Sequence, residues 1–183
     1  MAKILGIAGS LRKASFNRKL LVAAAGLMPA GSTLEIGTID GIPLYDQDVE
    51  DGEGMPPAVT ALKDAMRAAD GVLLVTPEYN NGIPGVFKNA IDWASRPPAE
   101  AAGVFAGRTF GVIGASPGGF GTILSQNHWL PVLRTLGVNL WTEGRFMLSR
   151  AGQAFDADGK LANDEMREML RKYLAGFVGF VEG

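Results

Sequence analysis

Two kinds of hydrophobic pattern follow one another along the chain. Short apolar or alternating runs predict strands, and apolar residues spaced about 3.6 positions apart predict amphipathic helices. The expected strands cover residues 3–8, 33–38, 71–76, 109–115 and 138–141. The expected helices cover residues 16–28, 58–69, 84–94, 121–136 and 163–181, with a kink at Pro131 in the fourth. This alternation predicts an α/β protein whose parallel sheet is covered by helices on both faces.

The order of these elements points to three loops at one edge of the sheet. Residues 39–57, rich in Gly, Pro and Asp, are expected to form a long loop. No linker or repeat divides the 183 residues, so we expect one domain over residues 1–183. Sheets of this kind bind ligands at the carboxyl ends of their strands. The candidate binding loops therefore follow residues 3–8, 71–76 and 109–115.

The charge balance excludes some partners. The chain has 17 basic and 19 acidic residues, and its net charge of -2 gives no electrostatic footprint for nucleic acid. No apolar run approaches the ~18 residues of a membrane span. The apolar stretch at the N-terminus is too short for a signal peptide, and the basic pair Arg12–Lys13 follows it instead of preceding it. We expect a soluble, cytoplasmic protein with no membrane or nucleic-acid partner.

Two residue counts narrow the chemistry further. The chain contains no cysteine, which excludes disulfides, thiolate metal sites and a cysteine nucleophile. It contains one histidine, His128, so a histidine-rich metal site is excluded and no metal is expected. His128 fits a general acid, or more simply a residue on a helix face or an interface. Any redox chemistry must therefore be carried by a bound cofactor.

The first candidate loop, Gly9–Asn17, has the parts of a phosphate site. It matches neither the P-loop pattern nor the dinucleotide-binding glycine pattern. Ser10, Ser15 and Asn17 are available to donate hydrogen bonds, and Arg12 is available to neutralise charge. The helix that follows adds free N–H groups and a partial positive charge. The cluster favours a phosphate monoester, although one such serine alone fits an ordinary helix cap.

The other two loops suit a planar ring. Residues 76–85 contain two prolines, the turn Asn81–Gly82 and the aromatic Tyr79, which fits either a ring site or a structural crossover. Residues 116–121 contain paired glycines, which allow close backbone approach to a flat ligand and also fit a flexible turn.

Taken together, the three loops resemble the NADPH-dependent FMN reductase family. The resemblance covers roughly residues 1 to 150. It rests on Gly9-Ser-Leu-Arg12 with Ser15-Phe-Asn17, on Pro77-Glu-Tyr-Asn80 with Ile83-Pro-Gly-x-x-Lys88-Asn89-Ala-x-Asp92-Trp93, and on Ser116-x-Gly118-Gly119. One departure is Asn81–Gly82, where the family often carries a serine. The resemblance implies a flavodoxin-like three-layer sandwich with five parallel strands in the order 2-1-3-4-5.

The resemblance also implies residue roles around FMN as cofactor. The phosphate and ribityl end would be held by Ser10, Arg12, Ser15, Phe16 and Asn17. The isoalloxazine ring would be lined by Pro77, Glu78, Tyr79 and Asn80. The pyrimidine side of the ring would meet Ser116, Gly118 and Gly119. No side chain is assigned a catalytic role, because the flavin carries the chemistry.

The implied activity is an NAD(P)H-dependent oxidoreductase. NADPH or NADH would pass a hydride through bound FMN to a small-molecule acceptor such as a quinone, an azo compound, chromate or free flavin. Family members form homodimers, often homotetramers, and the helix with Lys88, Asp92 and Trp93 fits such an interface. The same residues also fit an exposed i,i+4 ion pair beside a core tryptophan.

Three alternatives stay open. A flavodoxin-type electron carrier would not oxidise NAD(P)H itself, but such carriers are usually strongly acidic and this chain is not. A non-catalytic nucleotide-binding domain is compatible with the same fold. A hydrolase built on His128 lacks a recognisable nucleophile elbow.

Overall fold

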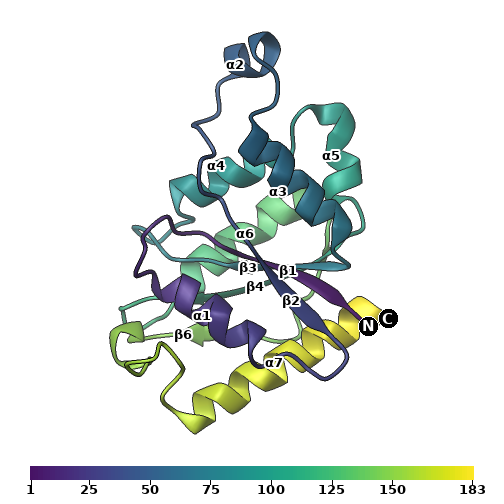
Figure 1. Ribbon diagram of the computed structural model, residues 1–183. Helices are drawn as coiled ribbons and strands as arrows, with labels where there is room; N and C mark the ends of the chain where they lie inside the picture. Colours follow the sequence, from purple (N-terminus) through teal and green to yellow (C-terminus); the bar gives the residue numbers. More distant parts are fainter.

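A parallel sheet runs through the centre of the computed structural model, which describes residues 1–183 (Figure 1). Its strand order is β2-β1-β3-β4-β5, and every pairing is parallel. The strands are β1 Lys3–Ala8, β2 Thr33–Gly37, β3 Gly71–Val75, β4 Thr109–Ala115, β5 Asn139–Leu140 and β6 Met147–Leu148. The expected α/β class and the expected strand order are confirmed.

The last expected strand, residues 138–141, is divided in the structure. β5 pairs with the beginning of β4, and β6 pairs with the end of β4 at Gly114–Ala115. Between them the N–H of Trp141 still donates to the carbonyl oxygen of Phe110 at 2.9 Å, and its ring packs edge-on against Tyr173 with ring centroids 4.7 Å apart. β6 was missed because its two residues are too few for a periodic signal.

Helices cover both faces of the sheet (Figure 1). They are α1 Phe16–Ala25, α2 Gln47–Gly52, α3 Pro57–Ala68, α4 Gly85–Ala94, α5 Pro98–Phe105, α6 Ile123–Thr135 and α7 Asp164–Glu182, with a short 3-10 helix at Ala151–Gln153. One buried cluster joins α1 and α7 to the sheet, and a second joins α3, α4, α5 and α6 to the other face. The sheet therefore lies between two separate cores. No helix is both long and apolar enough to cross a lipid bilayer.

Two helices were not expected from the sequence. α2 lies inside the segment 39–57 that we expected to be a loop, and α5 lies between α4 and β4. α2 begins at an Asp46 cap but buries none of its six residues, and α5 buries only Val104 and Phe105. Neither helix has the apolar stripe that a periodicity search detects. The expectation of a structureless loop over 39–57 is therefore wrong at α2.

The other helix limits follow local signals. Asn163 caps α7 by accepting a hydrogen bond from the N–H of Met166, as the sequence predicts. α1 ends at Ala25, three residues before the expected limit, because the chain turns at Gly26. α6 begins at Ile123 instead of residue 121 and continues through Pro131.

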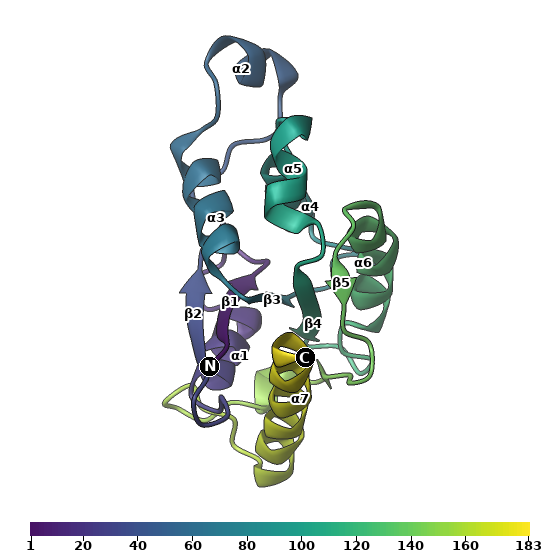
Figure 2. The ribbon, with the colours of Figure 1, turned by 90° about the vertical axis from the view of Figure 1, so that its right-hand side faces the viewer.

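The segment between β2 and α3 projects at one end of the molecule, where α2 lies beyond the helical layers (Figure 2). Its base is held by α4. Trp93 Nε1 donates to the carbonyl oxygen of Pro43 at 2.9 Å, and Asn89 accepts from the N–H of Tyr45 at 2.8 Å. Trp93 is fully buried, and Lys88 forms an i,i+4 ion pair with Asp92 at 2.6 Å. Within the chain, Asn89 and Trp93 therefore serve to hold this projecting segment.

Candidate functional site

The three candidate loops meet at the carboxyl edge of the central strands. β1, β3 and β4 are neighbours in the sheet, so the loops that follow them lie side by side (Figure 1). The N–H of Gly9 donates to the carbonyl oxygen of Val75 at 3.0 Å, and the N–H of Thr76 donates to that of Ile113 at 2.8 Å. The parallel pairing thus continues past the strands and fixes where each loop begins.

Two glycines allow this close assembly. A Cβ atom at Gly9 would overlap the ring of Phe87, and one at Gly114 would overlap the carbonyl oxygen of Thr76 and the hydroxyl of Thr122. Any side chain at these positions would push the loops apart.

The first loop leaves a set of backbone donors free. Ser15 caps α1, and its hydroxyl oxygen accepts from the N–H groups of Asn17 and Arg18 at 3.2 and 3.4 Å. Five N–H groups make no hydrogen bond within the protein, those of Ser10, Leu11, Lys13, Ala14 and Phe16. With the positive end of α1 beside them, these donors form a cradle suited to an anion.

Arg12 adds an unpaired positive charge to this cradle. No carboxylate lies within ion-pair distance of its guanidinium, which donates to the carbonyl oxygen of Ala14 at 2.6 Å. The guanidinium carbon lies 5.1 Å from the ring centroid of Phe16, and that ring stacks on Phe155 at 6.4 Å. Phe16 therefore supports Arg12 from the outside of the loop, and its ring is already engaged.

Asn17 connects the first loop to the third. Its side-chain Nδ2 donates to the carbonyl oxygen of Ala115, and its Oδ1 accepts from the N–H of the same residue, both at 2.8 Å. The side chain is buried, so these two bonds join the start of α1 to the end of β4. One Nδ2 hydrogen is left for a ligand.

The second loop is a tight hairpin that exposes an aromatic ring. Tyr79 and Gly82 exchange backbone hydrogen bonds at 3.0 and 3.1 Å, and Asn80 and Asn81 both have positive φ. Two successive positive φ angles are those of a type I′ turn, which asparagine tolerates well. Pro77 is buried at the base of the hairpin, and Tyr79 is 51% exposed at its tip.

Glu78 holds the second loop against α6. Its carboxylate accepts from the N–H groups of Leu124 and Ser125 at 2.9 and 3.0 Å. A carboxylate at this end of a helix is favoured by the helix dipole, and α6 has no side-chain cap of its own. The carboxylate of Glu78 is thus occupied by a structural contact.

A buried polar network lies behind this loop and was not found by sequence reasoning. The hydroxyl of Thr76 accepts from Trp129 Nε1 at 3.1 Å and lies 2.8 Å from the hydroxyl of Ser125. All three residues are fully buried. They fix the floor of the site, but no local motif in the sequence distinguishes them from ordinary core residues.

The third loop is supported by the segment that follows β6. The N–H groups of Arg150 and Ala151 donate to the carbonyl oxygens of Gly118 and Ser116, each at 3.0 Å. Arg150 adopts a left-handed backbone conformation to make this contact. A Cβ atom at Gly119 would meet nothing within 4 Å, and its N–H makes no hydrogen bond within the protein. Gly119 therefore presents a free donor to open space.

These features fit FMN. The phosphate group requires several donors and a positive charge, which the first loop and Arg12 provide. The flavin ring requires a flat, partly apolar surface with backbone donors, which Tyr79 and the free N–H groups of Asn80 and Gly119 provide.

Comparison with known proteins decides the family. The family model described as NADPH-dependent FMN reductase matches residues 2–153. The chain is 46% identical over 172 residues to an NAD(P)H-dependent FMN reductase of Pseudomonas aeruginosa, covering 94% of the chain and 91% of that protein. The chain belongs to the NADPH-dependent FMN reductase family. The expected family, the FMN cofactor and the NAD(P)H-dependent oxidoreductase activity are therefore confirmed.

Two further relatives agree with this assignment. A 2-hydroxy-1,4-benzoquinone reductase of Burkholderia sp is 36% identical over 179 residues, covering 98% of the chain and 96% of that protein. The solved structure of FerB, a flavoenzyme NAD(P)H:(acceptor) oxidoreductase from Paracoccus denitrificans, superimposes with a TM-score of 0.89 at 32% identity, covering 100% of this chain and 98% of that one.

His128, the single histidine of this FMN reductase family member, lies on the exposed side of α6. Its ring is close to the Tyr79–Gly82 hairpin, because a Cβ atom built on Gly82 would lie 3.8 Å from His128 Nδ1. It takes part in no hydrogen bond or ion pair. Its position is that of a residue on an exposed helix face, the simpler of the two interpretations.

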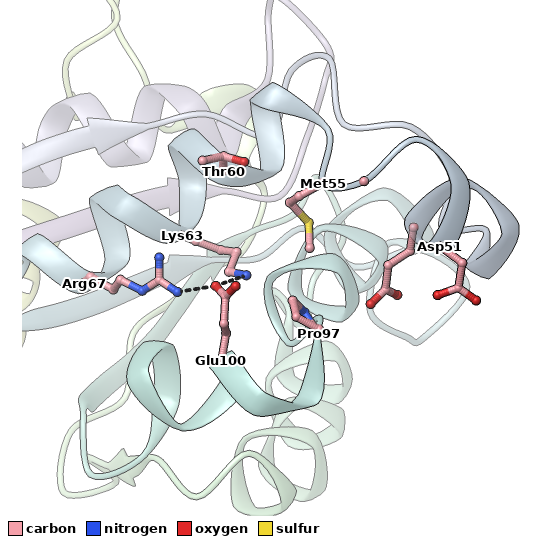
Figure 3. Close-up of a pocket in the computed structure, with 9 residues that line it drawn as sticks. Asp51, Met55, Thr60, Lys63, Arg67, Pro97 and Glu100 are labelled. Carbon is pink, nitrogen blue, oxygen red and sulfur yellow. Dashed lines mark hydrogen bonds and ion pairs between the residues drawn. The ribbon is translucent and has the colours of Figure 1, made fainter.

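A hollow of about 520 Å³ lies away from the three loops, between α2, α3 and α5 (Figure 3). Three of its charged lining residues are paired with one another, because Glu100 Oε2 lies 2.8 Å from Lys63 Nζ and 2.6 Å from Arg67 Nη2. Hydrogen bonds from Lys63 and Arg67 hold the pKa of Glu100 below its ordinary value. No residue of the three loops lines this hollow, so it is separate from the flavin site.

Proposed function

We propose that the protein is an FMN-dependent NAD(P)H oxidoreductase that reduces quinones, and that azo compounds, chromate and free flavin are further acceptors. The observation that carries the proposal is the convergence of three loops on one sheet edge, where free N–H groups and the unpaired Arg12 lie beside an exposed aromatic hairpin. Relatives named as quinone reductases support the acceptor class. Either NADPH or NADH is the reductant.

We propose that the first loop holds the phosphate and ribityl end of FMN. The hydroxyl oxygens of Ser10 and Ser15 accept backbone N–H groups, so each hydroxyl keeps its own proton to donate to the phosphate. Arg12 supplies charge and Phe16 supports it. Asn17 offers its remaining amide hydrogen while it fixes the loop to Ala115.

The second and third loops are proposed to enclose the flavin ring. Tyr79 and Pro77 supply apolar surface, and Asn80 supplies a backbone donor. Ser116, Gly118 and Gly119 meet the pyrimidine side, where the N–H of Gly119 is free. Glu78 lies behind this region, where its carboxylate accepts a hydrogen bond from the backbone at the start of α6.

When bound, FMN would supply the two-electron redox chemistry between NAD(P)H and the acceptor. The protein positions the ring and stabilises the negative charge that builds up on its pyrimidine side. The free N–H of Gly119 is placed to donate a hydrogen bond to that side. No side chain is required to act as an acid or a base.

The proposal is tested by spectroscopy of the purified protein. We expect a yellow protein with a flavin absorbance spectrum that bleaches when NADPH or NADH is added without oxygen, and that regains colour when a quinone is added. A colourless protein that takes up no FMN would contradict the proposal. A yellow protein that NAD(P)H does not bleach without a separate reductase would support the flavodoxin-type carrier instead.

We further propose a cytoplasmic homodimer or homotetramer built from one FMN-binding domain over residues 1–183. Self-association is supported by α6, where Ile123, Leu124 and Leu130 are each at least 40% exposed. These residues border a hollow of about 370 Å³ with Trp141 in its wall. Apolar side chains gathered on one surface are typical of protein interfaces. A net charge of -2 supports the absence of a nucleic-acid partner.

A further inference from the structure

Arg18 bonds to the outside of the first loop and was not among the expected site residues. It lies in the first turn of α1, and its Nε donates to the carbonyl oxygen of Ser10 at 3.1 Å. Its Nη2 donates to both carboxylate oxygens of Asp40, at 2.7 and 2.8 Å. One guanidinium group therefore links the loop after β1 to the segment after β2.

Asp40 is itself held in place. Its N–H donates to the hydroxyl of Thr38 at 3.0 Å, and the preceding residue, Ile39, is 3% exposed and belongs to the core. Gly41 follows with a φ of 80°, which turns the chain away immediately after the carboxylate. These contacts fix the backbone that carries the carboxylate paired with Arg18.

Fixing the Ser10 carbonyl also fixes a donor on the opposite side. The carbonyl of Ser10 and the N–H of Leu11 belong to the same planar trans peptide, in which C=O and N–H point in opposite directions. Arg18 binds the oxygen, so the N–H of Leu11 must point away from Arg18. That N–H is one of the five that have no partner within the protein.

We propose that Arg18 and Asp40 are a positioning pair that holds the Ser10–Leu11 peptide so that its N–H faces the FMN phosphate. The inference rests on the proposed flavin site and adds two residues to it. Arg18 acts through the backbone, because its charge is neutralised by Asp40. Arg12, which has no carboxylate partner, provides the charge.

The experiment compares FMN with riboflavin, which lacks the phosphate. Flavin fluorescence quenching on the full-length apoprotein gives both dissociation constants for wild type, Arg18→Met, Asp40→Asn and a control, Arg171→Met. Arg171 forms an exposed i,i+3 pair with Glu168 on α7, far along the chain from the loops. We expect Arg18→Met to raise the Kd for FMN about tenfold, because one charge-assisted hydrogen bond to the phosphate is lost. The Kd for riboflavin should stay unchanged. The control changes neither value.

Asp40→Asn separates positioning from direct charge attraction. This substitution leaves Arg18 charged but removes its anchor. If Arg18 positions the peptide, FMN binds more weakly to Asp40→Asn, and the double variant is no weaker than Arg18→Met alone. If Arg18 attracts the phosphate directly, losing the neutralising carboxylate makes FMN bind more tightly, which overturns the proposal.

Other outcomes are equally decisive. Equal losses of affinity for FMN and riboflavin in Arg18→Met would show general damage to the binding site and overturn the proposal. An unchanged affinity for FMN in both Arg18→Met and Asp40→Asn would also overturn it. Riboflavin binding also reports that each variant is folded. The proposed function is judged separately, by whether the wild-type protein binds FMN and whether NAD(P)H bleaches the bound flavin.

Discussion

Side chains that bond to nearby backbone shape the proposed flavin site at the scale of single residues. Ser10 and Ser15 accept N–H groups of their own loop, Asn17 bonds to Ala115, and Arg18 bonds to Ser10. Each bond fixes the direction of a peptide and leaves other donors facing outward. The loop is therefore prepared for an anion before the ligand arrives, which lowers the entropy cost of binding.

Replacing Arg12 by alanine tests the charge in this loop. We expect Arg12→Ala to weaken FMN binding by about 1.5–3 kcal/mol, because a charge-assisted contact to the phosphate is lost. The measurement is flavin fluorescence quenching at two salt concentrations. The Kd for FMN should depend less on salt in the variant, because a positive charge has been removed. Lys13→Ala, which removes a neighbouring exposed charge, is the matched control. Unchanged affinity in Arg12→Ala would place the phosphate elsewhere.

Replacing Asn17 by alanine tests the link between two loops. The substitution leaves the N–H and carbonyl of Ala115 buried without their partners, so we expect a loss of about 1–3 kcal/mol in the free energy of unfolding. Urea denaturation of the apoprotein measures it, with Asn127→Ala on the exposed side of α6 as control. We also expect FMN to bind more weakly, and by a larger factor than riboflavin, because the amide hydrogen proposed to meet the phosphate is lost while both loops move. Wild-type stability in Asn17→Ala would mean that the two bonds contribute little.

At the scale of elements, what the sequence predicts depends on how much each element buries. The strands and the helices with apolar stripes were located within a few residues, because periodicity reports contact with a core. α2 buries nothing and α5 buries two residues, so neither has the apolar stripe that a local pattern reports, and α5 is held by ion pairs to residues distant in the sequence. Glu100 of α5, paired with Lys63 of α3, is one such contact.

The contact between α3 and α5 should make folding sensitive to acid. Hydrogen bonds from Lys63 and then Arg67 lower the pKa of Glu100 below its ordinary value of 4.5. The unfolded chain therefore takes up a proton at higher pH than the folded chain does. The stabilisation is complete above pH 4.5 and is lost as the pH falls through the lowered pKa of the folded state.

Glu100→Gln is the corresponding variant. We expect it to be less stable than wild type at neutral pH, because Lys63 loses the carboxylate that pairs with it while remaining 3% exposed. We also expect its melting temperature to fall less steeply with acid than that of wild type. Glu168→Gln, from an exposed pair on α7, is the control. If the melting temperatures of wild type and Glu100→Gln fell equally with acid, the Glu100 carboxylate would not be the source of the acid sensitivity.

At the scale of the whole molecule, the position of the site follows from topology. Parallel neighbouring strands bring the loops after β1, β3 and β4 to one edge, so sequence order and strand type were enough to bring Ser10, Tyr79 and Gly118 together. The supporting residues come from elsewhere: Asp40 follows β2, and Arg150 follows β6. They were missed because their contacts span long stretches of sequence and carry no motif.

The apolar surface of α6 gives a test of assembly. If Leu130 lies in an interface between copies of the chain, a buried carboxylate there is costly, so Leu130→Glu should shift the protein to a smaller species at micromolar concentration. Sedimentation velocity measures the change, and retained flavin absorbance shows that the fold persists. Met169→Glu is the control, because Met169 is 49% exposed on α7, a different helix. A wild-type protein that sediments as a monomer would refute the proposed oligomer, whereas an oligomer that Leu130→Glu leaves intact would move the interface away from α6.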